Sequence, residues 1–440
     1  MSKRDGPAGT ARGLAVYAVA MIAGALAGLV GALFRDALVL ADEFRISLVT
    51  RLHEWPAVGW LVPVVMAAVA VMLARLIVIR VPEAAGSGVQ RIEAQVRHQT
   101  DSDPLRVVPA KFIGGVLAIG SGLALGREGP TIQMAAAIGG KCSRILKLVR
   151  DDQLTIQSAL AGAGLGVAFN APLGGVIFVV EELTKSIRMR VIAATLLATA
   201  TAVGVMRLMN GGSADFFVAN IPELPPMSYV GFVVFGLLVG FGGALYSKTI
   251  VLFLDLFAKF DRVPLLVRAG IVGGAVGLLG WFFPAVVGGG DNLTQEMLVG
   301  AMPLAVVFGV IVIRWFLGPL SYSIGTPGGL FAPLLVLGAA LGTVFAGVLG
   351  LISSDLFGDP VAYALVGMAA LFAAVVRAPI TGIALVVEMT AVNGQFVPIL
   401  LATGAATITA GLTGSEPIYD TLRHRMLASP AATPGDAAKA

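Results

Sequence analysis

Three glycine-rich segments are candidates for anion binding, because each could start a helix and leave backbone N–H groups unpaired. The segments are Gly86-Ser87-Gly88-Val89-Gln90, Gly126-Arg127-Glu128-Gly129-Pro130 and Gly329-Leu330-Phe331-Ala332-Pro333. A helix N-terminus attracts anions through its unpaired N–H groups and the positive end of its dipole. Proline in the first turn favours such a helix start. Neutral donors of this kind hold an ion weakly enough for it to leave again.

Glu128 is the acidic residue of these segments, and the third segment has Phe331 at the matching position. A carboxylate beside an anion site competes with the anion for the same helix N-terminus. Protonation removes that competition, so one side chain could couple protons to anion movement. The alternative is that Glu128 only stabilises the helix start or pairs with Arg127. Ionisable groups in apolar membrane segments are costly and usually functional, which favours the first interpretation.

Other polar residues interrupt apolar stretches. Glu181 and Glu182 end the apolar run 169–182. Either one of them faces the interior and passes protons, or both mark a helix end at the water interface. Lys111 starts an apolar run, where it is either a buried countercharge or a lysine that snorkels towards water, and we expect the second. Tyr419 lies near the start of a short last helix, where its phenol either donates to an anion or anchors the helix at the interface.

The composition predicts that membrane-spanning helices position these residues. Of 440 residues, 57% are hydrophobic and only 13% are charged, whereas about 25% are charged in soluble domains. Mean hydropathy is +0.90. This composition provides too few polar residues to cover the surface of a soluble protein. It is also more apolar than the composition of a disordered chain. We interpret the chain as an α-helical polytopic membrane protein, since no alternating strands of a barrel occur.

The same composition argues against other classes of site. The single Cys142 excludes an intrachain disulfide and a cysteine-based zinc cluster. The three histidines are too widely spaced for a metal site. The net charge of +4 fits basic cytoplasmic loops better than binding to nucleic acid. We therefore expect no metal and no cofactor.

The two halves of the chain resemble each other. Three pairs of segments match in order at a nearly constant spacing: 27–34 with 239–246, 126–139 with 329–342, and 171–181 with 378–388. The alternative is that small-residue packing motifs recur by chance. Duplicated halves are typical of transporters and are often inverted. The sequence thus predicts an all-α membrane protein with two inverted repeats of tilted and broken helices.

The predicted domain is a membrane domain over residues 14–427. The first repeat covers about 14–210 and the second about 228–427, with the polar stretch Asn210–Met227 between them. Residues 1–13 are predicted to be a cytoplasmic segment, and 428–440 a flexible tail. An uncleaved first helix is expected over Leu14–Leu33. Basic residues flank both ends, so both termini are expected in the cytoplasm, with an even number of crossings.

Together these segments resemble the signature segments of the CLC family of chloride channels and chloride/proton antiporters. The resemblance covers nearly the whole chain and includes Asn170-Ala171-Pro172 before Glu181 and Pro417-Ile418-Tyr419. It implies a homodimer in which each subunit has its own pore. In the first segment Val89-Gln90 departs from the family pattern, which has isoleucine and proline there. The chain also lacks the cytoplasmic CBS pair of many eukaryotic members, so it resembles the short bacterial form.

The resemblance also implies the roles of individual residues. A central chloride would be held by the hydroxyls of Ser87 and Tyr419 and by the N–H groups of Leu330 and Phe331. Glu128 resembles the extracellular-side gating glutamate. Glu182 resembles the intracellular proton-transfer glutamate of the antiporters.

We therefore predict a chloride/proton antiporter in a bacterial inner membrane, with chloride and protons as the transported ions. The open alternative is a passive chloride-selective channel of the same family, depending on whether Glu182 faces the proton route. A cation-coupled carrier of another anion would need donors different from Ser87 and Tyr419. An enzyme is not expected. Ser87 has no evident base, because the nearest histidine, His98, lies in a polar loop.

Overall fold

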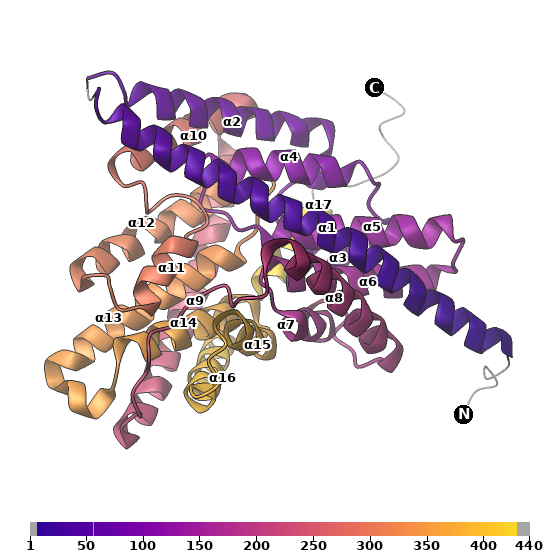
Figure 1. Ribbon diagram of the computed structural model, residues 1–440. Helices are drawn as coiled ribbons and strands as arrows, with labels where there is room; N and C mark the ends of the chain where they lie inside the picture. Colours follow the sequence, from indigo (N-terminus) through magenta and orange to yellow (C-terminus); the bar gives the residue numbers. More distant parts are fainter. Residues whose placement is uncertain (1–6, 56, 429–440) are drawn as a thin grey trace.

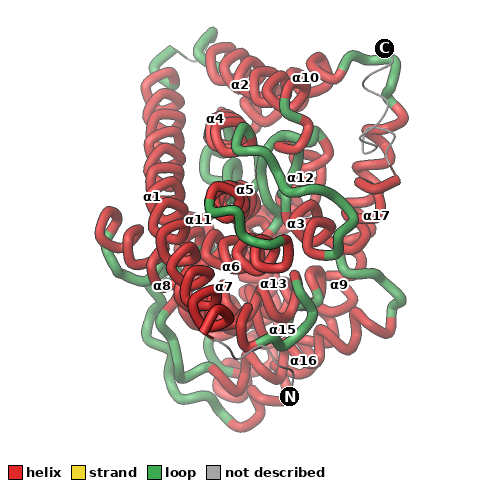
Figure 2. The backbone as a smooth tube through the Cα atoms, turned by 90° about the vertical axis from the view of Figure 1, so that its right-hand side faces the viewer, coloured by secondary structure: helices red, strands yellow, loops and turns green. Residues whose placement is uncertain are grey.

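The computed structural model describes residues 7–55 and 57–428 of the chain. Within those residues it is helical, and the only β-type pairing there is an isolated bridge between Gly126 and Gly329 (Figure 2). Residues 1–6 of the predicted N-terminal segment and residues 429–440 of the predicted tail lie outside the described residues.

The helices follow one another through both halves of the chain (Figure 1). The first half contains α1 (Pro7–Leu52), α2 (Leu61–Arg80), the 3-10 turn η1 (Pro82–Ala84), α3 (Val89–Val96), α4 (Val107–Gly120), α5 (Glu128–Ile145), α6 (Arg150–Ala168), α7 (Pro172–Phe178), the π-helical turn η2 (Val179–Leu183) and α8 (Met189–Asn210). The second half contains α9 (Pro226–Lys259), α10 (Leu265–Phe282), α11 (Asp291–Leu298), α12 (Leu304–Ser323), α13 (Phe331–Phe357), α14 (Pro360–Val376), α15 (Pro379–Thr390), α16 (Phe396–Leu412) and α17 (Ile418–Ala428). Residues 211–225 form no helix and connect the halves.

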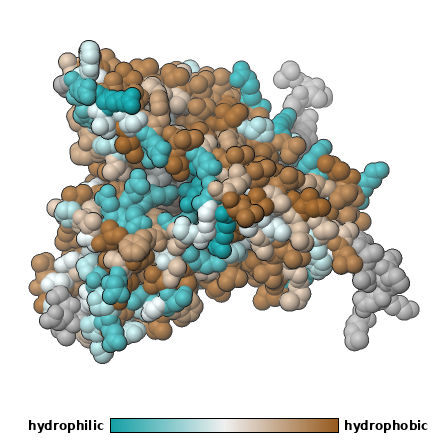
Figure 3. All heavy atoms as spheres, in the orientation of Figure 1, coloured by the Kyte–Doolittle hydropathy of each residue, from teal (hydrophilic) through white to brown (hydrophobic). Residues whose placement is uncertain are grey.

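The fold is that of a multi-pass membrane protein. Among the described residues, 7 helices are long and apolar enough to cross a membrane. Hydrophobic residues cover most of the face seen in Figure 3, and hydrophilic residues gather mainly towards its middle and edges. This distribution matches a surface in contact with acyl chains rather than with water.

Equivalent helices of the two halves pack in equivalent ways. Helix α1 packs on α8 as α9 packs on α16, and α5 packs on α6 as α13 packs on α14. A Cβ atom on Gly28 would lie 2.3 Å from the carbonyl oxygen of Ala202. A Cβ atom on Gly240 would lie 2.5 Å from that of Ala406. Small residues thus allow close helix approach at matching places, which confirms the predicted repeat.

The halves also cap each other's helices. The carboxylate of Glu181 accepts the N–H of Thr381 at 2.7 Å, at the start of α15. The carboxylate of Glu388 accepts the N–H of Gly174 at 2.7 Å, at the start of α7. A carboxylate is favourable at a helix N-terminus because of the helix dipole. This exchange of caps is what a two-fold relation between inverted halves produces.

Helix α1 is longer than the predicted Leu14–Leu33. It continues to Leu52 although charged residues follow Leu33. Arg35 pairs with Asp215 at 2.9 Å, and Asp36 accepts a hydrogen bond from Asn210. Because these charges meet partners inside the protein, they do not mark the end of the helix.

The centre of the molecule is formed by helices that are buried on every side. Every residue of α14 from Val361 to Val376 is buried. Helix α6 is buried from Ile156 to Ala168. A helix that is apolar all round belongs in such a position. Helix α5 packs on α6, and α13 packs on α14; Figures 1 and 2 show these helices within the molecule.

Candidate anion and proton site

The three glycine-rich segments meet in the middle of the protein. The N–H of Gly126 donates to the carbonyl of Gly329 at 2.9 Å, and the N–H of Gly329 donates back at 2.8 Å. The N–H of Gly328 donates to the carbonyl of Gly86 at 3.1 Å. Segments far apart in the sequence therefore form one structure around the starts of α3, α5 and α13.

The carboxylate of Glu128 occupies the N-terminus of α13. The side chain is fully buried, and its Oε1 accepts the N–H of Phe331 at 2.7 Å. A Cβ atom on either Gly126 or Gly329 would lie 2.0 Å from a carboxylate oxygen of Glu128. The two glycines therefore provide the space for the carboxylate. An acidic group sits where the positive end of a helix dipole would hold an anion.

Arg127 does not form an ion pair with Glu128. Its guanidinium pairs with Asp215 at 3.2 Å and with Asp291 at 3.4 Å, and its Nε donates to the carbonyl of Ala168 at 2.9 Å. The alternative in which Glu128 is only a partner of Arg127 is thus wrong. The sequence did not show that Asp215 pairs with Arg127, because Asp215 lies in the segment between the halves and belongs to no recognisable motif.

Two hydroxyl groups approach the same place. The oxygens of Ser87 and Tyr419 are buried and interact with each other, and neither makes a hydrogen bond to another group in the described part of the chain. A Cβ atom on Gly129 would lie 2.6 Å from Oγ of Ser87, so this hydroxyl contacts the start of α5. Tyr419 is 0% exposed, which excludes the interface-anchor alternative. An unsatisfied buried hydroxyl is costly unless it has a further partner.

Aromatic rings enclose the start of α13. The ring of Phe331 contacts four others, with centroid distances from 4.7 to 6.4 Å: Phe169, Phe178, Phe372 and Tyr419. They exclude water from the N-terminus of α13, and electrostatic interactions are stronger in such an apolar surrounding.

The two neighbouring glutamates of η2, which follows α7, have different environments. Glu181 caps α15 and reaches the other half of the chain. Glu182, on the π-helical turn η2, is only 2% exposed, and its Oε1 makes no hydrogen bond within the described residues. Neither side chain marks a helix end in water, so that alternative is wrong. Glu182 is the buried acid of the pair.

Lys111 lies inside the protein rather than at the interface. It is 0% exposed, and its Nζ donates to the carbonyl of Gly86 at 2.6 Å. The expectation that it snorkels towards water is wrong, and the alternative of a buried lysine has the correct location. Its stem runs inwards because the carbonyl of the first glycine-rich segment accepts its hydrogen bond. A buried amine thereby lies beside Ser87.

An ion cluster fixes α17, the helix that carries Tyr419. Asp420 accepts Nη2 of Arg423 at 2.7 Å and Nζ of Lys185 at 3.0 Å. Glu93, on α3, lies 3.3 Å from Nε of Arg423 and 3.7 Å from Nζ of Lys185. Lys185 follows Glu182 by three residues. The cluster therefore ties the segment with the buried acid to the helix with the buried phenol. Sequence analysis did not find it.

Asp420 gives this cluster a defined dependence on pH. Burial raises the pKa of its carboxyl, but hydrogen bonds from Arg423 and Lys185 outweigh burial and lower the pKa to about 2. Such a group stabilises the fold above its ordinary pKa of about 3.9, and the contribution disappears as pH falls towards 2.

We expect Asp420→Asn to reduce the free energy of unfolding by about 1 kcal/mol at pH 7. Thermal melting of the detergent-solubilised proteins measures this. The difference from wild type should be constant from pH 5 to 8 and shrink below pH 4. A difference that changes around pH 6 instead would show that another group is responsible.

Polar cavities reach the site from two directions. One, of about 820 Å³, is lined by Gly86, Gln90 and Tyr322 next to the first segment. The other, of about 310 Å³, is lined by Gly126 and Arg127 next to the second. Ser87 and Glu128 are both buried and follow directly after Gly86 and Arg127 of these linings.

Gln90, which departs from the family motif, lines the larger cavity. Its Nε2 donates to the hydroxyl of Tyr322 at 3.4 Å, and the N–H of Ser87 donates to the same oxygen at 3.5 Å. Both hydrogen bonds are long and therefore weak. The side chain of Gln90 thus contacts Tyr322 at the mouth of the site, and the helix start at Val89 forms without the proline.

Inverted repeats, broken helices and helix N-termini that meet at a buried centre define a membrane transporter with a site suited to a small anion. The model of the family described as "Voltage gated chloride channel" matches residues 68–411. The chain is 38% identical over 423 residues to the H(+)/Cl(-) exchange transporter ClcA of Vibrio cholerae serotype O1 (strain M66-2), covering 94% of this chain and 90% of that protein. It is 34% identical to the protein of the same name from Klebsiella pneumoniae (strain 342), covering 94% and 89%. The chain belongs to the voltage-gated chloride channel family, as the motifs predicted.

A solved structure agrees with this assignment. It is described as a slow cyanobacterial Cl-/H+ antiporter, is 31% identical, and superposes with a TM-score of 0.88 over 94% of this chain and 99% of that one. The predicted fold class is therefore confirmed.

Proposed function

We propose that this protein exchanges chloride for protons across a bacterial membrane. The observation that carries the proposal is the carboxylate of Glu128 at the N-terminus of α13, bonded to the N–H of Phe331. A chloride ion and this carboxylate would compete for the same donors. When Glu128 takes up a proton, its charge is lost and an anion replaces it at the helix dipole.

The anion site is built from neutral donors. Chloride at the centre would accept hydrogen bonds from the hydroxyls of Ser87 and Tyr419 and from the N–H groups of Leu330 and Phe331. The two hydroxyls lie close together and are buried without a hydrogen bond to any further described group, which supports this role. The aromatic rings around Phe331 keep water out, so the donors act on a dehydrated ion.

Glu182 is the proposed proton-transfer group on the opposite side from the outer gate. It is buried. The charged groups that interact with it electrostatically are Lys185, Glu93, Asp420 and Glu181. A passive channel needs no buried acid there. Relatives named as H(+)/Cl(-) exchange transporters and the antiporter structure also favour exchange over the channel alternative.

Coupled fluxes in liposomes test the proposal. Purified protein would be reconstituted in chloride-loaded vesicles, and chloride efflux and external pH would be recorded together. Exchange predicts that a chloride gradient drives proton movement when no pH gradient is present at the start. It also predicts that a proton gradient drives chloride movement. Chloride efflux without proton movement would instead assign the protein as a channel.

Tyr419 offers a direct test of the anion site. We expect Tyr419→Phe to weaken chloride binding by about 10-fold to 100-fold, because a hydrogen bond to a charged group contributes about 1.5–3 kcal/mol. Isothermal titration calorimetry measures the affinity. Tyr363→Phe is a matched control, since this phenol is also buried without a hydrogen bond but lies on α14. Equal affinities of the Tyr419→Phe variant and wild type would remove Tyr419 from the site.

Assembly and orientation complete the proposal. We infer a homodimer with one pathway per subunit, in the inner membrane, with both termini cytoplasmic. Single-molecule photobleaching of a labelled protein tests the stoichiometry by counting two steps per spot. Labelling of a cysteine introduced at Ser2 by a membrane-impermeant maleimide, in spheroplasts and in inverted vesicles, tests the side of the N-terminus.

A further inference from the structure

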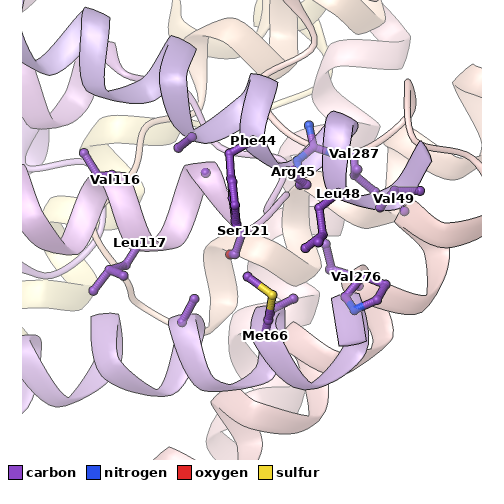
Figure 4. A pocket seen from close by; sticks show the side chains of 17 residues that line it. Phe44, Arg45, Leu48, Val49, Met66, Val116, Leu117, Ser121, Val276 and Val287 are labelled. Atoms are coloured by element: carbon purple, nitrogen blue, oxygen red, sulfur yellow. The ribbon is translucent and has the colours of Figure 1, made fainter. Parts of the chain in front are cut away.

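An apolar cavity lies apart from the proposed pathway, between α1, α2, α4 and α10 (Figure 4). Its volume is about 220 Å³. Phe44 of α1, Met66 of α2, Val116 of α4 and Val276 of α10 form its walls. Arg45 and Ser121 are the polar residues of the lining. Small side chains such as Ala70 leave the space open.

The cavity opens on a surface that faces the bilayer. Helices α1, α2 and α10 are candidate membrane spans. Phe44 is 55% exposed and Met66 is 41% exposed at the cavity. Residues with this exposure on a membrane span contact acyl chains. The hydrocarbon of the membrane therefore has direct access to the cavity.

The lining decides what can fill this space. Water needs two to four polar partners, and these walls offer almost none. An empty cavity loses the dispersion contacts of its lining atoms. Acyl chains are flexible, apolar and in contact with the opening, so a segment of an acyl chain matches the space in both chemistry and access.

Arg45 supplies a charge at one end of the cavity. It also lines the polar cavity next to Arg127, so it stands where the apolar space meets the aqueous side. Its Nη2 pairs with Asp42, and its Nη1 donates to the carbonyl of Pro284 at 3.3 Å. The Arg45 side chain is 13% exposed. Each Nη carries a second N–H, and a free guanidinium N–H is a donor for a phosphate oxygen.

We propose that the cavity is a binding site for an anionic phospholipid, with one acyl chain in the apolar space and the phosphate at the guanidinium of Arg45. The site does not depend on the proposed ion exchange. It does border the polar cavity of about 310 Å³ next to Arg127, since Arg45 and Val287 line both cavities. Val287 lines the apolar space, and the N–H of the next residue, Gly288, donates to the carbonyl of Gly122 at 2.7 Å. The bound acyl chain would thus contact the loop at Val287, which also lines the polar cavity next to Arg127.

Native mass spectrometry of the full-length protein tests the acyl-chain part. Delipidated protein in detergent would be titrated with dioleoyl phosphatidylglycerol. Ala70→Phe fills the cavity, whereas Val69→Phe adds the same ring at the neighbouring, 48% exposed position on the same helix. We expect wild type and Val69→Phe to bind one more tight lipid per chain than Ala70→Phe. Ala70→Leu fills less of the space and replaces Ala70→Phe if the larger side chain impairs folding. Equal binding by wild type and both filling variants would overturn the proposal.

Arg45→Gln tests the headgroup part in the same titration. We expect about 10-fold weaker binding of phosphatidylglycerol, because a charge-assisted hydrogen bond is lost. Arg51→Gln, which removes an exposed arginine from the same helix, is the control and should bind as wild type does. Unchanged affinity in Arg45→Gln would overturn the assignment of Arg45 to the phosphate. Chloride flux through the same preparations shows whether each variant is folded.

Discussion

Glu128→Gln is expected to abolish proton movement while chloride movement persists. Glutamine has nearly the same shape, and its amide oxygen can still accept the N–H of Phe331 that Glu128 accepts at 2.7 Å. It can neither take up nor release a proton. The exchange between carboxylate and anion at α13 therefore loses its dependence on protons. Simultaneous recording of chloride efflux and pH in liposomes should show proton flux at the level of protein-free vesicles.

The control for this variant is Glu54→Gln, which neutralises an exposed glutamate beyond α1. It should keep both fluxes. Unchanged proton flux in Glu128→Gln would show that the shared gate lies elsewhere. Loss of both fluxes would show that the charge, rather than its protonation, keeps the pathway working.

Glu182→Gln is expected to stop proton coupling from the other side. Its carboxylate is buried, and its Oε1 has no hydrogen bond within the described residues. The amide keeps the packing of η2 but cannot relay a proton. Chloride should still cross, because none of the proposed anion ligands changes. We expect a chloride gradient to drive protons in wild type and not in the variant, with chloride efflux remaining within about threefold of wild type, a change of under 1 kcal/mol in the barrier.

Glu416→Gln is the matched control for Glu182, because Glu416 is exposed close to α17. It should leave coupling intact. Proton pumping that survives in Glu182→Gln would make Glu182 a structural carboxylate. The inner proton route would then have to use other groups.

The sequence predicted the motifs of the site better than their surroundings. Glycine and proline at fixed spacing identify helix starts, and an acid among them stands out, so Glu128 and the three segments could be recognised. Ser87, in the first segment, and Tyr419, near the start of the last helix, were candidates from the sequence itself, and the family resemblance gave both the role of chloride ligand. The structure brings these residues to one buried place. Their roles as chloride ligands stay predictions until binding is measured.

What the sequence could not predict depends on contacts between distant residues. Lys111 was expected at the interface, since its position beside an apolar run does not show whether the stem runs to water or inwards. The first helix was predicted over Leu14–Leu33 from its apolar residues alone, since the sequence does not show that Arg35 pairs with Asp215, 180 residues away. Glu181 and Glu182 are neighbours in sequence, yet only three-dimensional packing sends one to a helix cap and the other into the interior.

The exchange of caps between Glu181 and Glu388 has a consequence for biosynthesis. The ribosome makes Glu181 long before Thr381 exists, and it makes Gly174 long before Glu388. During this interval the first half carries an unmatched carboxylate and an uncapped α7 in or near the bilayer. The native arrangement can form only after the chain has been made as far as α15. A chain truncated before Ile380 therefore leaves both the Glu181 carboxylate and the N-terminus of α7 without their partners.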